Sequence, residues 1–162
     1  MANWQKFWQL RGEHRWLFIQ AIALLPVITL ILRLWGLKRL YRWLDCWVPI
    51  QLKAVPTDQN GTPLLEESAW QAFQLRQAET IARVVQAAVK HSGQWANCLQ
   101  RSVTLWYLLR QQGFDPVLRI GVCKTPNKLE AHAWIELQGT VLNDRPDIGQ
   151  TFTPFSGAIY WP

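Results

Sequence analysis

A cysteine at the expected start of a helix is the first candidate for chemistry. Cys98 follows Asn97, and an amphipathic run from Leu99 to Gln112 ends at Gly113. Asparagine is a favourable N-cap, and glycine tolerates the left-handed conformation at which helices often end. The first helical turn carries unpaired N–H groups and the positive end of the helix dipole, and both favour a thiolate over a thiol. Position alone leaves two interpretations open, an activated nucleophile or a small residue buried at a helix end.

A nucleophilic cysteine needs a general base, and the sequence offers three histidines. His14 precedes an apolar run, which fits an interfacial or solvated position. His91 ends a predicted helix, where a cationic side chain suits the dipole. His132 lies in the segment Ala131–Leu137, which predicts a strand. His132 is therefore the candidate base, and a structural strand histidine is the alternative.

The turn after this strand predicts which carboxylate orients His132. Gly139 fits the left-handed third position of a three-residue loop over residues 137–139, with a G1 bulge. The resulting register pairs Glu136 with Thr140, Trp134 with Leu142, and His132 with Asp144. Residues directly opposite one another have Cβ atoms about 5 Å apart, so Asp144 would reach the imidazole. A two-residue turn would send Asp144 to the opposite face, and Asp147 is the competing carboxylate.

The expected order of elements, helices first and strands later, is typical of an α+β fold. The helical or apolar segments are 17–32, 34–48, 64–91 (with a possible break near Gln77) and 99–112, and the strands are 117–123, 131–137, 140–144 and 159–161. Prolines and an Asn-Gly pair mark a linker within residues 50–63. We therefore predict a helical N-terminal segment, 1–60, and an α+β domain with a small antiparallel sheet, 61–162.

Charge and apolar residues distinguish the N-terminal segment. The chain has 17 Lys and Arg against 11 Asp and Glu, and most of this excess lies in the first 42 residues. This asymmetry disfavours nucleic acid as a partner and favours anionic lipid or an acidic protein. The apolar run 17–32 is short for a membrane span and contains Pro26. Three placements stay open: burial against the domain or a partner, peripheral contact with the membrane surface, and a span.

The three cysteines, Cys46, Cys98 and Cys123, have no metal-ligand spacing. Their odd number and scatter indicate a reducing compartment, which we expect to be the cytoplasm, and no structural metal or cofactor.

Five short segments follow one another in an order and with gaps that match those of a known protein family. They are Asn97-Cys98-Leu99-x-Arg101-Ser102, Leu108-Leu109-x-x-x-Gly113, Leu118-x-Ile120-Gly121-Val122, Ala131-His132-Ala133-Trp134-x-Glu136 and Val141-x-Asn143-Asp144. Together they resemble the lasso-peptide leader peptidases, B-type maturation proteases with a transglutaminase-like, papain-related cysteine hydrolase fold. The resemblance covers roughly residues 65–155 and implies a catalytic triad of Cys98, His132 and Asp144.

The resemblance implies an enzyme that cuts the leader from a ribosomally made precursor peptide. Its implied partners are a small leader-recognition protein and an ATP-dependent cyclase that closes the macrolactam. Residues 1–60 are helical and apolar rather than similar to the recognition domain, so we expect that domain on a separate chain. A transglutaminase-like acyltransferase and a non-catalytic peptide-binding scaffold are the alternative functions.

Further residues are assigned around the triad. The oxyanion would meet the backbone N–H of Cys98 and the side chain of Gln94, unless Gln94 is an ordinary loop residue. Trp95 and Trp134 are candidates for the walls of the substrate cleft, with core packing as the alternative for Trp134. Arg101 follows Cys98 at i+3 and is a candidate for substrate binding or for a structural ion pair.

Overall fold

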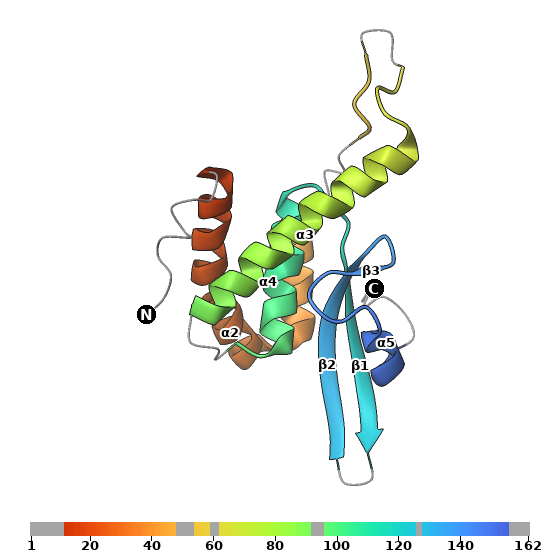
Figure 1. The fold of residues 1–162 in the computed structure, drawn as a ribbon. Helices are drawn as coiled ribbons and strands as arrows, with labels where there is room; N and C mark the ends of the chain where they lie inside the picture. The colour runs from red at the N-terminus through yellow and green to blue at the C-terminus, as the bar shows by residue number, and fades with distance from the viewer. Residues whose placement is uncertain (1–11, 48–53, 59–61, 92–95, 126–127, 156–162) are drawn as a thin grey trace.

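Three long helices pack beside a small antiparallel sheet (Figure 1). The computed structural model describes residues 12–47, 54–58, 62–91, 96–125 and 128–155. Its elements are, in order, α2 (Gly12–Trp47), α3 (Glu67–His91), α4 (Cys98–Gln111), β1 (Val117–Thr125), β2 (Lys128–Leu137), β3 (Thr140–Val141), α5 (Ile148–Thr151) and β4 (Thr153–Pro154). The expected α+β class is confirmed.

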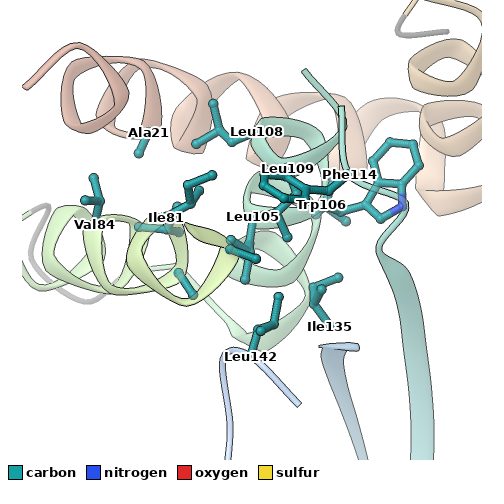
Figure 2. Close-up of a cluster of buried hydrophobic side chains, with 14 of the residues drawn as sticks. Ala21, Ile81, Val84, Leu105, Trp106, Leu108, Leu109, Phe114, Ile135 and Leu142 are labelled. Atoms are coloured by element: carbon teal, nitrogen blue, oxygen red, sulfur yellow. The ribbon is translucent and has the colours of Figure 1, made fainter. Parts of the chain in front are cut away.

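The helical layer forms because each helix carries a buried apolar stripe. In α3, Ile81, Val84 and Val85 are buried, with the i, i+3, i+4 spacing of one helix face. Helix α3 runs unbroken from Glu67 to His91, without the possible break near Gln77. Figure 2 shows Ile81 of α3 and Leu105 of α4 meeting in the core beneath α2.

Helix α2 belongs to the same core. Its residues Leu17, Ala21 and Ile28 are buried in the cluster that also contains residues of α3 and α4. Gly36 has φ 74° and ψ 170°, a conformation open to glycine, and there the helix kinks. The described part of the predicted N-terminal segment therefore packs on the domain through one of its faces.

The sheet has the strand order β3-β2-β1-β4 with antiparallel neighbours. Leu118 of β1 pairs with Ile135 of β2, and both side chains join the helical core. Because side chains alternate along a strand, His132 and Trp134 lie on the opposite face. Strands β1 and β2 confirm two of the expected strands, and β3 covers only Thr140–Val141 of the strand expected at 140–144. Strand β4 is not among the expected strands, and the strand predicted at 159–161 lies outside the described residues.

The predicted register after β2 is wrong. The structure pairs Leu137 with Thr140, so the turn has two residues, Gln138 and Gly139, with φ values of 52° and 78°. Positive φ at both positions is the mark of a type I′ turn, whose twist matches that of the flanking strands. The physical reason for this register is burial. It brings Leu142 to the core beside Ile135, as Figure 2 shows, and the two are joined by a backbone hydrogen bond of 2.9 Å.

Gly121 leaves room for the residues that pack on the face of the sheet opposite the helices. It lies opposite His132 in the β1–β2 ladder and opposite Pro154 in the β1–β4 ladder. A Cβ at this position would lie 2.9 Å from Cη2 of Trp134, 3.0 Å from the backbone oxygen of Thr153 and 3.1 Å from Cβ of Phe152. Two of these neighbours are backbone or Cβ atoms, which cannot move aside cheaply. Glycine is therefore required here by close approach.

We expect Gly121→Ala to lower the free energy of unfolding by about 1–3 kcal/mol, because the added methyl group overpacks this layer. Urea unfolding followed by circular dichroism measures the change. Gly149→Ala is the matched control, since a Cβ at Gly149 meets nothing within 4 Å, and it should stay within about 0.5 kcal/mol of the wild type. Equal stability of the two variants would contradict the packing argument.

Candidate active site

Cys98 is the first residue of α4, and a capping box fixes this start. The Asn97 side chain accepts a hydrogen bond of 2.9 Å from the Gln100 backbone N–H, and the Gln100 side chain accepts one of 2.8 Å from the Asn97 N–H. The predicted N-cap is thus confirmed. In a helix the N–H groups of the first turn have no acceptor within the helix, and those of Cys98 and Leu99 find none elsewhere in the described residues, so they can meet an anion. Cys98 is half-buried and carries a free thiol.

His132 and Asp144 meet despite the different register. Nε2 of His132 lies 2.6 Å from Oδ2 of Asp144, and both side chains are about one-fifth exposed. The contact forms because the ladder ends at Val141 and residues 142–144 bend, which carries Asp144 around the edge of β2. The competing carboxylate, Asp147, lies 3.9 Å from Arg145 instead. With Nε2 held by Asp144, Nδ1 is the ring nitrogen left to exchange a proton with a nucleophile.

Side chains, rather than a neighbouring strand, occupy the edge of β2 beside this pair. Ser102 of α4 donates a hydrogen bond of 2.9 Å to the Ala133 carbonyl oxygen. Asn143 donates one of 2.9 Å from Nδ2 to the Ser102 hydroxyl and accepts one of 2.8 Å at Oδ1 from the Ile135 N–H. This network, which we call the edge network, consists of Ser102, Ala133, Ile135 and Asn143. It ties the helix that carries Cys98 to the segment that carries Asp144.

Neither Ser102 nor Asn143 was assigned a role from the sequence. For each of these two residues, its position relative to a proposed catalytic residue could have indicated a role. Ser102 lies four residues after Cys98, so both lie on one side of the helix, and Asn143 directly precedes Asp144 at the end of a hairpin.

A cavity of about 410 Å³ opens beside the edge network. Its walls come from α3, from the start of α4, from β2 and from the segment after β3. The lining residues used below are Val85, Lys90, Cys98, Arg101, Asn143 and Asp144. Cys98 and Asp144 therefore face one cavity, and His132 is bonded to Asp144. Among the described residues no hydrogen bond joins the Cys98 thiol to His132, and such contacts are often loose before substrate binds.

Two aromatic rings pack near the His132 imidazole on the face of the sheet away from the helices. The ring of Phe152 lies 5.0 Å from that of His132, and the ring of Trp134 lies 6.4 Å away, stacked at 21°. Trp134 is fully buried, and its indole N–H donates a hydrogen bond of 2.8 Å to Glu136, which also accepts one of 2.9 Å from Arg119. Trp134 thus packs behind His132 and does not line the cavity, in agreement with the packing alternative and not with a wall of the cleft.

The remaining predicted residues divide into two groups. Gln94 and Trp95 lie outside the described residues, so their assignments stay predictions. Arg101 is exposed and lines the cavity, and within the described part of the chain it forms no ion pair. Its position favours the substrate-binding interpretation. In the described ranges no group of three or more His, Cys, Asp or Glu side chains is arranged to hold a metal ion.

Comparison with known proteins identifies the family of the chain from its sequence. The family model of the transglutaminase-like superfamily matches residues 48–157, which is more than half of the chain. Neither the curated proteins nor the solved structures yield a match. The matched range includes Cys98, His132 and Asp144.

We expect Asn143→Ala to lower the free energy of unfolding by about 1–3 kcal/mol, because it leaves the Ile135 N–H without its partner at the sheet edge. Urea unfolding measures the loss. Gln150→Ala, at an exposed position of α5, is the control and should change the free energy by less than about 0.5 kcal/mol. An Asn143→Ala protein as stable as the control would show that the edge network does not hold the segment after β3.

Proposed function

Because the chain belongs to the transglutaminase-like superfamily, which includes cysteine peptidases and acyltransferases, we propose that it is a cysteine peptidase that removes the leader from a lasso-peptide precursor. One observation supports the proposal above the others. The His132–Asp144 hydrogen bond of 2.6 Å lies beside the cavity into which the helix-terminal Cys98 faces. Nucleophile, base and orienting carboxylate are the parts that acyl transfer through a thioester requires.

The proposed reaction has two steps. In the first, His132 takes up the thiol proton as Cys98 Sγ attacks the carbonyl carbon of the last leader residue, and it passes this proton to the departing amine of the core peptide as the C–N bond breaks. In the second, His132 takes a proton from water, the water oxygen bonds to the same carbon, and the C–S bond breaks to restore the thiol. The first-turn N–H groups of α4 stabilise the oxyanion in both steps, and Asp144 orients the imidazole and stabilises its cation.

The cavity suggests how a peptide would be held. Val85 of α3 contributes to an apolar wall, and Lys90 and Arg101 place two cationic side chains at its lining. The cavity thus combines apolar surface, which can hold a side chain of the peptide, with polar and charged groups that can fix its orientation. In this proposal a separate leader-recognition protein delivers the precursor, and an ATP-dependent cyclase takes the released core peptide. The enzyme acts in the cytoplasm, where precursor peptides are made.

We expect Cys98→Ala to abolish cleavage of a leader–core peptide, with a loss of about 10⁴-fold or more, because no nucleophile remains. The assay incubates the precursor with the full chain and its recognition protein and follows both products by mass spectrometry. Cys123→Ala, which removes a free cysteine of β1, is the control and should retain cleavage. Cleavage by Cys98→Ala, or an intact precursor with the wild-type protein and every plausible helper, would contradict the proposal.

We expect Asp144→Asn to lower kcat by about 10²–10⁴-fold, because an amide no longer holds the imidazole in the required tautomer or stabilises its cation. The isosteric exchange Asp147→Asn removes a carboxylate three residues away that does not contact His132, and it should leave kcat within about twofold. Steady-state kinetics on the same peptide compares the two. Similar losses in both variants would remove Asp144 from the proposed triad.

A further inference from the structure

Helix α2 carries two apolar faces, and the domain covers one of them. Leu17, Ala21, Leu25 and Ile28 are buried against the domain. The opposite side of the helix carries large apolar side chains that are about half exposed or more, namely Trp16 (63%), Ile19 (51%), Val27 (49%), Leu30 (57%) and Leu34 (66%). Their spacing of three, four, seven or eight residues places them on one face. We call these five residues the outer face of α2.

No charged residue interrupts the outer face. Residues 16–32 contain no Asp, Glu, Lys or Arg, and Arg33, Arg39 and Arg42, which follow, are exposed. Trp16 and Trp35, both exposed, lie at the two ends of the stretch, about 28 Å apart at 1.5 Å per residue. Tryptophan and arginine at the ends of an uncharged segment suit contact with lipid headgroups, both in a helix that spans a bilayer and in one that lies on its surface.

The net charge of the chain comes from residues 1–42, the segment that includes the outer face. Residues 1–42 contain seven Lys and Arg and one Glu, and residues 43–162 contain ten basic and ten acidic residues. The formal net charge of +6 therefore belongs to the part of the chain that carries the outer face. This charge complements an anionic bilayer surface.

Length and hydropathy alone would also permit a span over Arg15–Leu37. The packing argues against a span, because the buried face of α2 is held by α3 and α4. Arg83 and Lys90 of α3 are exposed, and a spanning α2 would draw such charged groups toward hydrocarbon. Only the outer face is available to lipid.

We propose that the outer face of α2 binds the surface of an anionic lipid bilayer, with the helix lying along the interface and its apolar side chains at the boundary between headgroups and acyl chains. Arg33, Arg39 and Arg42 contact lipid phosphates. The domain stays on the aqueous side, attached through the buried face. The outer face contains none of the proposed catalytic residues, so lipid binding can be tested independently of the peptidase activity.

Sedimentation of the full chain with sucrose-loaded vesicles tests the proposal. The protein should pellet with vesicles of phosphatidylglycerol and phosphatidylcholine, and raising the salt concentration or using phosphatidylcholine alone should weaken its binding. The triple variant Ile19→Gln, Val27→Gln, Leu30→Gln should lose about tenfold or more in lipid partitioning. Because these side chains are exposed, its urea unfolding should match that of the wild type.

A second triple variant, Leu64→Gln, Leu65→Gln, Leu129→Gln, is the matched control. These leucines are 62%, 41% and 69% exposed and lie outside α2, so lipid partitioning should not change. Equal losses in the two triple variants would show unspecific hydrophobic adsorption and overturn the proposal. A wild-type protein that remains in the supernatant with every vesicle would also overturn it and would leave the outer face to a protein partner.

Discussion

The edge of β2 at Ala133 and Ile135 is the constraint on which the site depends. Backbone N–H and C=O groups at the edge of a sheet need partners, and here β3 is too short to supply them. Ser102 and Asn143 supply them from two different elements. Because Ser102 lies one helical turn after Cys98, and Asn143 directly precedes Asp144, satisfying the strand edge also positions the proposed nucleophile and the proposed carboxylate.

This arrangement puts the chemistry at the edge of the sheet rather than on one of its faces. The helix-facing side of β2 is occupied by Ala133 and Ile135 in the core, and His132 lies on the other side, in contact with the rings of Trp134 and Phe152. Asp144 reaches His132 around the edge that β3 leaves open. The packing of α2, α3 and α4 fixes the position of the first turn of α4, and the cavity lies between that turn, α3 and the sheet edge.

Local signals predicted a large part of this structure. The alternation in β1 and β2 and the helical period of α3 gave the class and most elements, because burial of one face depends on spacing along the chain. The pairing of His132 with Asp144 was also expected, but from a three-residue loop that does not exist. Gln138 adopts a positive φ that is uncommon for a residue other than glycine, and the sequence pattern gave no sign of it.

By itself, the sequence determined most of the elements and the start of α4, because capping and periodic burial are properties of neighbouring residues. Asn97 and Gly113 lie at the helix ends that their residue types predict. Only the tertiary structure decided the strand register, the edge network and the position of Trp134 behind His132. These features depend on contacts between distant segments, such as the burial of Leu142 beside Ile135, whose energies no local pattern contains.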